Sequence, residues 1–366
     1  MTANKQSNRL TELDVLRGLA AVWVLSFHYT AYFDRLFHHD KSVPLFVSGA
    51  HAVNLFFIIS GFVIYMTLAK TKRPLDFVVS RFSRLYPAYW CAVLITFLVV
   101  RTFGLPGLEV GVKDLVANLT MLQRYFGFKH VDNSYWTLSY ELGFYAIMFC
   151  LFCLKALKRP LLICAIFLAL QSAVIILVIC KLLVVPAIIS KILMLSYGHQ
   201  FACGIVFYQM YKHGARNFWI HLLPLWALAN EYFMPHMLYG QIDPSVTVML
   251  AFVAAFYLFL FGYLKWICWG PLAFLGTISY TLYLIHQHIG YVVIRYGYSQ
   301  GFNPFVSIGM AILVAFGLAI GITFIVEKPC LHLIRNWYRK RTELREVSPI
   351  PVAAVVEPVP TNISES

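Results

Sequence analysis

The sequence predicts an all-helical protein that crosses a membrane many times. Hydrophobic residues make up 60% of its 366 residues, charged residues make up 12%, and the mean hydropathy is +0.72. A soluble protein of this length cannot hide so much apolar surface. Runs of about 20 apolar residues recur along the chain, which is the length that an α-helix needs to span a bilayer.

Ten spans are expected, at residues 12–33, 49–69, 85–103, 136–156, 160–180, 185–211, 217–235, 244–264, 271–293 and 304–326. Two of them are the weakest, because one is long and contains Lys191 and the other contains Pro224, Asn230 and Glu231. No small-residue cleavage motif follows an early apolar run, so the first span is expected to stay in the mature protein. The eight cysteines are scattered without zinc-type spacing, so no metal is expected.

The formal net charge of +13 fits the basic cytoplasmic loops of membrane proteins better than a nucleic-acid-binding protein. It also suits a phosphate-rich ligand at the cytoplasmic face. With the N-terminus inside, most Lys and Arg fall in inner segments, which predicts that both termini are cytoplasmic. The outer segments hold fewer: Arg35, Lys41, Arg101, Lys113, Arg124, Lys129, Lys181 and Arg295.

Two segments outside the spans stand out. Residues 104–135 form the longest outer loop, with Gly, Pro and mixed charges. Residues 342–366 are rich in Pro, Val, Ser and Glu and are expected to be disordered. We therefore divide the chain into a membrane domain, 1–335, and a basic, then Pro-rich cytoplasmic tail, 336–366.

The first span, "LDVLRGLAAVWVLSFHYTAYF", carries Arg17 and His28. An arginine at membrane depth costs roughly 2.5–3.5 kcal/mol even on the mildest scale. Eleven residues correspond to about three helical turns plus 20° and ~16 Å of rise, so both side chains share a face at different depths. His accepts a proton near neutral pH, and Arg offers forked donors to phosphate or carboxylate. Alternatively, the histidine is a packed core residue and the arginine snorkels to the inner surface.

Other polar groups are expected near the depth of His28. Glu141, in "NSYWTLSYELGFY", lies about five residues below the outer surface on the fourth span, and Asn54 and His286 lie at similar levels on theirs. Glu141 and His28 could then meet across helices. Each residue alone could be a structural hydrogen-bond partner, but together they favour a site.

"RFSRLYPAYW" places Arg81 and Arg84 one helical turn apart at the inner edge of the third span. They form either an ordinary positive flank or a phosphate clamp.

Six stretches in this order resemble the membrane acyltransferase-3 family, which includes bacterial enzymes that O-acetylate lipopolysaccharide and other surface glycans. They are "LDVLRGLAAVWVLSFH", "NLFFIISGFVI", "RFSRLYPAYW", "WTLSYELGFY", "ISYTLYLIH" and "VEKP", and they cover about residues 10–330. The resemblance implies about ten helices in the bacterial inner membrane. It also implies an acetyl-CoA donor from the cytoplasm and a hydroxyl acceptor on an outward-facing glycan such as O-antigen.

The family's essential Arg and His fall on Arg17 and His28, and its Arg-x-x-Arg falls on Arg81 and Arg84. His28 would take the proton from the acceptor hydroxyl, and Glu141 would orient it or stabilise its imidazolium. Arg17, Arg81 and Arg84 would bind the donor. Supporting or acceptor-side roles are expected for Asp14, Asn54, Ser60, Trp136, Ser139, Tyr145, Tyr283 and His286.

Several alternatives stay open. An acetyl-His intermediate competes with general-base catalysis. The acceptor could be a small molecule, and the donor a longer acyl-CoA. A proton-coupled transporter would use the same buried Arg, His and Glu, although no repeated halves of the transporter kind are evident. The expected partners are acetyl-CoA, a glycan or lipid-linked glycan, and membrane lipids, without nucleic acid or a tightly bound cofactor. The sequence leaves open whether the chain forms a homodimer.

Overall fold

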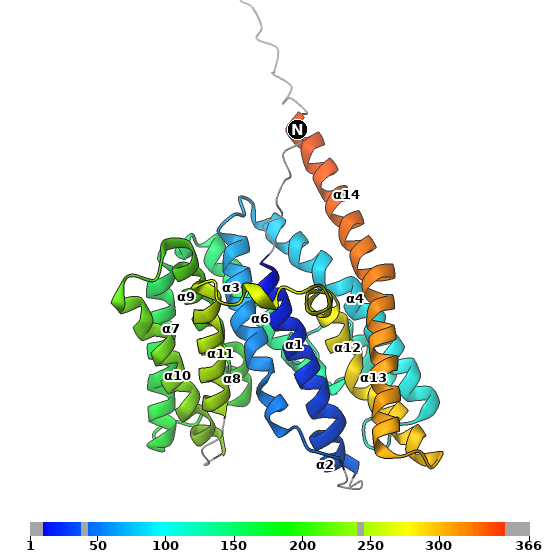
Figure 1. The fold of residues 1–366 in the computed structure, drawn as a ribbon. Coiled ribbons are helices and arrows are strands. Elements are labelled where there is room, and N and C mark those ends of the chain that lie inside the picture. The colour runs from blue at the N-terminus through cyan, green and yellow to red at the C-terminus, as the bar shows by residue number, and fades with distance from the viewer. Residues whose placement is uncertain (1–9, 38–42, 240–244, 348–366) are drawn as a thin grey trace, which may run out of the picture.

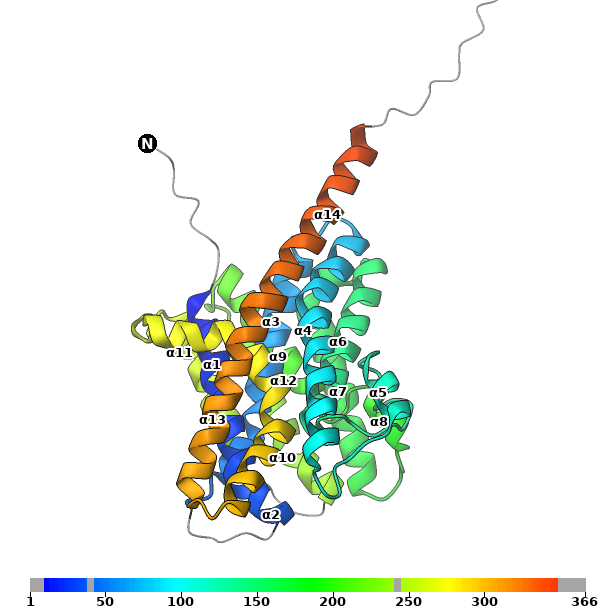
Figure 2. The ribbon, with the colours of Figure 1, turned by 90° about the vertical axis from the view of Figure 1, so that its right-hand side faces the viewer.

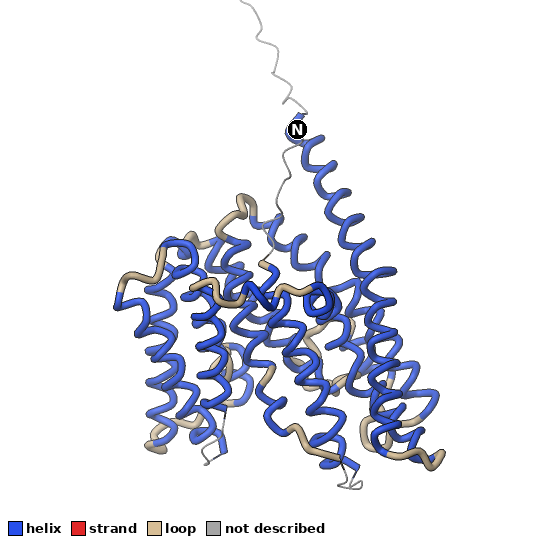
Figure 3. Tube along the Cα trace, viewed as in Figure 1, coloured by secondary structure: helices blue, strands red, loops and turns tan. Residues whose placement is uncertain are grey.

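The structure is a computed structural model that describes residues 10–37, 43–239 and 245–347. These residues form helices and connecting loops, with no strand among them (Figure 3). The elements in order are α1 (Thr11–Phe27), π-helix η1 (His28–Tyr32), α2 (Phe33–Phe37), 3-10 helix η2 (Val47–His51), α3 (Val53–Leu68), α4 (Pro74–Phe103), α5 (Val112–Asn118), 3-10 helix η3 (Asn133–Tyr135), α6 (Trp136–Cys153), 3-10 helix η4 (Ala156–Lys158), α7 (Pro160–Ile179), α8 (Ala187–Ile192), α9 (Gly198–His213), α10 (Phe218–Tyr239), α11 (Ser245–Leu260), 3-10 helix η5 (Lys265–Ile267), α12 (Gly270–Ser299), α13 (Pro304–Gly321), π-helix η6 (Ile322–Glu327) and α14 (Lys328–Val347).

The helical fold class is confirmed. Within the described residues, five helical segments are long and apolar enough to cross a membrane: Val47–Leu68, Pro74–Phe103, Asn133–Cys153, Pro160–Ile179 and Pro304–Thr342. Such helices are those of a multi-pass membrane protein. The other predicted spans, and the orientation, stay predictions. α1 begins and α14 ends on the same side of the bundle, which is the arrangement expected if both termini are cytoplasmic (Figure 1).

Three predicted spans have different bounds. The span expected at 85–103 begins at Pro74, because proline suits the first turn of a helix and Asp76 lies in that turn. The span expected at 185–211 is two helices, α8 and α9, separated near Met194, which has a positive φ of 54°.

The last span does not end at residue 326. α13, η6 and α14 continue to residue 347, so the expected domain boundary between residues 335 and 336 falls inside a helix. In Figure 1, α14 rises beyond the rest of the bundle. The rest of the predicted disordered tail, 348–366, lies outside the described residues.

Two close helix crossings hold the centre of the bundle. α12 packs against α1 and α13, and α3 packs against α9. A Cβ on Gly276 would overlap the carbonyl oxygen of Asp14 in α1, and a Cβ on Gly204 would overlap that of Ile58 in α3. Small residues allow membrane helices to approach this closely. The helices that carry the predicted site residues are therefore fixed against one another near their backbones.

The segment 104–135 was expected to be an outer loop, but its residues 104–132 fold back against the middle of α4. Tyr89, near the middle of that helix, donates its hydroxyl to the Asn118 carbonyl at 2.8 Å, and Ser139 Oγ donates to the Met121 carbonyl at 3.0 Å. Figure 2 shows α5 beside α4 and α6. Irregular backbone at membrane depth needs such partners, because lipid offers none.

Candidate active site

A cavity of about 230 Å³ surrounds His28. Its walls come from α1 and η1, from η2 and α3, from η3 and α6, and from α12. The lining residues are Val24, Phe27, His28, Tyr32, Gly49, Ala50, Val53, Asn133, Trp136, Tyr283 and Gln287. We refer to it as the outer cavity. Its walls combine apolar and aromatic residues with the polar side chains of His28, Asn133 and Gln287.

A π-helix begins at His28, and such wide turns often occur at functional sites. His28 Nδ1 lies 3.2 Å from the Tyr291 hydroxyl, and Gln287 Nε2 lies 3.3 Å from the same hydroxyl. With Nδ1 held by Tyr291, Nε2 is the nitrogen left for a molecule in the outer cavity. The ring of His286 lies 5.1 Å from that of His28, centroid to centroid. His286 and His28 are therefore neighbours, as their predicted depth indicates.

His286 itself is fully enclosed. Its Nδ1 lies 2.8 Å from the Tyr283 carbonyl, so Nδ1 carries the proton and donates it. Its Nε2 is buried and has no hydrogen-bond partner in the described part of the chain. Tyr29 donates to the carbonyl of His286 at 2.7 Å, which fixes η1 against α12 at this level.

A second, smaller cavity of about 30 Å³ lies next to Arg17, with room for roughly one or two water molecules. We refer to it as the inner cavity. Ser60, Glu141 and Tyr280 also line it. Ser60 Oγ donates to Glu141 Oε1 at 3.0 Å, and the Tyr145 hydroxyl donates to the same oxygen. The inner cavity thus contains one arginine and one carboxylate from different helices.

Val53 and Tyr283 line both cavities, so the two adjoin. The Tyr283 hydroxyl is 2.8 Å from Thr137 Oγ1 and donates to the Ser134 carbonyl at 3.0 Å. Because these bonds fix Tyr283, its ring forms a stable wall between the cavities. Arg17 lines the inner cavity and His28 the outer one, in agreement with the shared helix face that their spacing predicts.

The expected contact between Glu141 and His28 is wrong. Glu141 lies in the inner cavity with Arg17, while Asn133 and Trp136 line the cavity around His28. Because residues 104–132 fold back into the bundle, α6 starts already at the depth of His28. Glu141 is five residues further along, about 7.5 Å deeper.

Asn54 is also displaced from the expected site. Its amide donates to Glu231 Oε1 at 3.3 Å on α10. Glu231 Oε2 lies 2.5 Å from His199 Nε2 and accepts a bond from Gln200 at 2.9 Å. The carboxylate that weakened the predicted span 217–235 is therefore fully engaged inside the bundle, where it joins α3, α9 and α10.

The remaining supporting residues divide by location. Trp136 lines the outer cavity, and the Arg124 guanidinium lies 5.7 Å from its ring centre. Ser139 instead holds the 104–132 segment, as described above. Asp14 lies in the first turn of α1, within electrostatic reach of Arg84.

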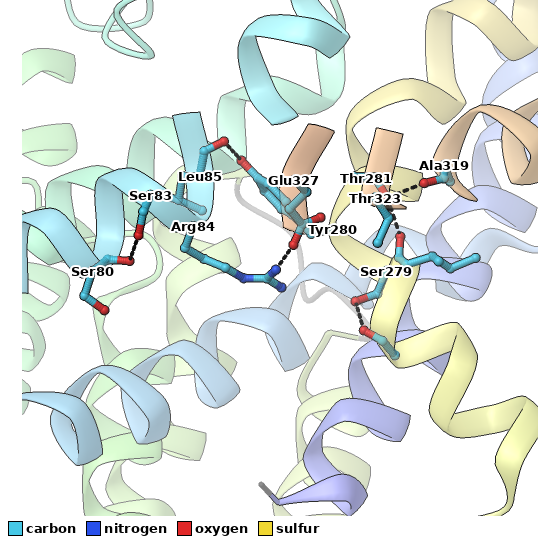
Figure 4. Close-up of polar contacts among 12 residues, drawn as sticks. Ser80, Ser83, Arg84, Leu85, Ser279, Tyr280, Thr281, Ala319, Thr323 and Glu327 are labelled. Atoms are coloured by element: carbon cyan, nitrogen blue, oxygen red, sulfur yellow. Dashed lines mark hydrogen bonds and ion pairs between the residues drawn. The ribbon is translucent and has the colours of Figure 1, made fainter. Parts of the chain in front are cut away.

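The two arginines of the predicted clamp have different surroundings. Arg84 forms an ion pair with Glu327 at the end of η6, and its guanidinium lies 5.6 Å from the Tyr280 ring centre (Figure 4). Arg81 donates to Ser80 Oγ at 3.0 Å and borders an apolar groove between α4 and α6. Arg17 and Arg81 both lie within electrostatic reach of Arg84, so the three positive charges are near one another.

Sequence reasoning missed Tyr291 as the partner of His28 and Gln287 as the partner of Tyr291, and it gave Glu327 no role. The signal for the first pair was present: they lie four residues apart in an apolar span, directly after His286. Glu327 was noticed as part of the "VEKP" motif. Its partner, Arg84, lies 243 residues earlier, so no local pattern links the two residues.

A family model described as an acyltransferase domain, of the acyltransferase-3 type, matches residues 10–326. Two curated proteins align over shorter parts of the chain. "Exopolysaccharide production protein ExoZ" of Rhizobium meliloti is 29% identical over 118 residues, 31% of this chain and 37% of that protein. "Protein 2 in picA locus" of Rhizobium radiobacter is 35% identical over 106 residues, 27% of this chain and 51% of that protein. The chain thus spans about half or less of these relatives. No solved structure matches it.

Proposed function

Because the chain belongs to the acyltransferase-3 family, we propose that it is an O-acetyltransferase of a bacterial inner membrane. It would move an acetyl group from cytoplasmic acetyl-CoA to a hydroxyl of an outward-facing glycan such as O-antigen. The name of the Rhizobium meliloti relative, which concerns exopolysaccharide production, supports a glycan acceptor. The lining of the outer cavity supports it further, because aromatic side chains next to hydrogen-bonding groups of His28, Asn133 and Gln287 suit a sugar ring and its hydroxyls.

In the proposed reaction, His28 Nε2 accepts the proton of the acceptor hydroxyl. The oxygen attacks the thioester carbonyl, an ester bond forms, and the carbon–sulfur bond breaks. The leaving CoA thiolate then takes the proton back from the imidazolium, so that the products are the acetyl ester and free CoA. Tyr291 is a positioning residue, because its hydroxyl holds Nδ1 of His28. A positioned base is typically worth 10²–10⁴ in rate.

The donor would enter from the side where the arginines are grouped. Arg17, Arg81 and Arg84 supply positive charge, and Glu141, held by Ser60 and Tyr145, balances the charge of Arg17 in the inner cavity. Arg84 takes part as a fixed charge that is already paired with Glu327. Val53 and Tyr283 form the common wall of the inner and the outer cavity, so the Tyr283 side chain has to move aside and the inner cavity has to widen for the thioester end of the donor to reach His28.

One observation carries this proposal: in a chain of this family, Arg17 and His28 line two adjoining cavities inside one helical bundle. The test uses purified protein in lipid nanodiscs, acetyl-CoA and a glycan acceptor, with free CoA thiol and acetylated glycan as readouts. His28→Ala should lower acceptor-dependent CoA release by at least a hundredfold. His213→Ala, an exposed histidine at the end of α9, is the matched control and should keep wild-type activity.

Wild-type protein that neither releases CoA nor acetylates any hydroxyl acceptor would contradict the enzyme proposal. Near-normal turnover by His28→Ala would contradict only the role of this residue. Mass spectrometry of the surface glycans of cells with and without the protein identifies the acceptor. An unchanged glycan profile, together with acetylation of a small molecule, would replace the glycan by that molecule.

A further inference from the structure

A polar pocket of about 460 Å³ lies between the first turns of α4 and the helix α14. It is separate from the two cavities described above, and the first turns of α4, which help to line it, lie on the side of the bundle where α1 begins (Figure 1). Its polar and charged lining residues include Arg73, Asp76, Ser80, Arg335, Tyr338 and Arg339. Residues 327–342 follow the part of the chain that the family model matches, which ends at residue 326. We refer to it as the arginine pocket.

The pocket is held together by hydrogen bonds between α4 and α14. Arg335 Nε donates to Ser83 Oγ at 3.2 Å, and its terminal nitrogen donates to the Ser80 carbonyl at 3.4 Å. The Tyr338 hydroxyl donates to Asp76 Oδ1 at 2.7 Å. These contacts fix the position of α14, so the arginines on it are presented to the pocket from a defined helix face.

The charge of the lining is positive. Three arginines face one carboxylate, Asp76, whose two oxygens already accept from Arg73 and Tyr338. A pocket of this size with an excess of guanidinium groups suits a phosphorylated molecule, because the fork of an arginine matches two phosphate oxygens.

A series of arginines connects this pocket to the inner cavity. Arg81 lies within electrostatic reach of Arg335, and Arg84 lies within reach of both Arg81 and Arg17. From Ser80 to Arg84 the rise along α4 is only about 6 Å. A long anionic molecule bound in the arginine pocket would therefore have Arg81, the paired Arg84 and Arg17 next to it in the direction of the inner cavity.

We propose that the arginine pocket binds the phosphorylated nucleotide end of the acyl donor, so that its thin arm extends along α4 toward Arg17. The proposal rests on the acetyl-CoA donor of the proposed function. It adds a separate claim, that Arg335 and Arg339 of α14 recognise the adenosine phosphates. The headgroup of an anionic lipid carries the same phosphate chemistry, and the test separates the two sources.

The experiment measures the binding of adenosine 3′,5′-bisphosphate and of CoA to the full-length protein in neutral-lipid nanodiscs. Arg339→Gln should weaken both dissociation constants about fivefold to tenfold, since it removes a charge-assisted contact in a partly solvated site. Lys340→Gln is the matched control. It removes the same charge from the next residue of α14, which does not line the pocket, and should bind as the wild type does. Arg335→Gln, which also loses the bonds to Ser80 and Ser83, is the second variant.

A donor that lacks the nucleotide tests whether Arg339 acts on the nucleotide end of the donor. The KM for acetyl-pantetheine should be the same for wild type and Arg339→Gln, whereas the KM for acetyl-CoA should rise about as much as the dissociation constant. The proposal is overturned if wild-type protein does not bind the bisphosphate, or if Arg339→Gln binds it as tightly as Lys340→Gln. It is also overturned if the variant differs from wild type only in nanodiscs with anionic lipid. Bisphosphate binding is measured without turnover. A failure of the proposed acetyltransferase function can therefore be distinguished from a failure of the arginine pocket to bind the nucleotide.

Discussion

The ion pair between Arg84 and Glu327 is a buried contact whose removal should destabilise the fold. The side chain of Glu327 is 3% exposed and that of Arg84 is 27% exposed. Glu327 Oε2 has no other partner among the described residues. Arg84→Met would leave the carboxylate buried and unpaired. Breaking a buried pair costs about 3–5 kcal/mol. Because Arg84 is partly exposed, we expect the unfolding free energy to fall by about 3 kcal/mol, the lower end of this range.

The double variant Arg84→Met/Glu327→Leu tests the cause. Replacing both members of a buried pair by apolar residues is often neutral, so this variant should regain stability to within about 1 kcal/mol of wild type. The assay is reversible unfolding in detergent micelles, followed by circular dichroism. Arg101→Met, an exposed arginine near the other end of α4, is the matched control and should be close to wild type.

The same variants separate stability from donor binding. If Arg84 also contacts a donor phosphate, the stable double variant still has a raised KM for acetyl-CoA, by about tenfold. If the arginine serves only the ion pair, the double variant regains both stability and KM. The reasoning about the ion pair is refuted if Arg84→Met is as stable as wild type, or if the double variant is no more stable than the single one.

Three further predictions follow from single contacts. Tyr291→Phe keeps the ring but loses the hydroxyl next to His28 Nδ1, so acetyl transfer should fall about tenfold to a hundredfold while CoA binding, measured by titration, stays unchanged. Tyr89→Phe removes one of the two donors of the Asn118 carbonyl, which keeps the Met121 N–H at 2.9 Å, and should lower the unfolding free energy by about 0.5–1.5 kcal/mol. Gly276→Ala should lower the melting temperature clearly, because the added methyl group overlaps the α1 backbone; a melting curve equal to that of wild type would contradict the close crossing.

The local parts of this fold follow from the sequence, and the long-range parts do not. The apolar runs predict that the segments are helices. The relative position of Arg17 and His28 follows from helical periodicity, because both residues lie in one continuous helical segment. The depth of Glu141 was misplaced because it depends on residues 104–132. When a loop that is assumed to lie outside the membrane folds back into the bundle, the next helix begins deeper than assumed. The predicted depth of every residue on that helix is then wrong.

The partners of polar side chains were the other weak point. Asn54 was assigned to the site by depth alone, but depth does not say which side of a helix a residue faces. Its carboxylate partner, Glu231, was noticed only as a reason to doubt a span. In a membrane a buried carboxylate that is satisfied by three donors argues for a packed helix, because lipid would leave it unpaired.

The separation of the two cavities has a physical consequence for the proposed chemistry. An imidazolium forms when His28 accepts the proton, and any nearby guanidinium repels it. At an effective dielectric constant of about 20, two like charges 5 Å apart repel by roughly 3 kcal/mol, and at the ~16 Å rise between Arg17 and His28 by roughly 1 kcal/mol. The difference of about 2 kcal/mol corresponds to a factor of roughly 30 in rate. Phosphate recognition and proton transfer therefore need opposite surroundings. A bundle that keeps Arg17, Arg81 and Arg84 near one another and places His28 three helical turns from Arg17 meets both needs.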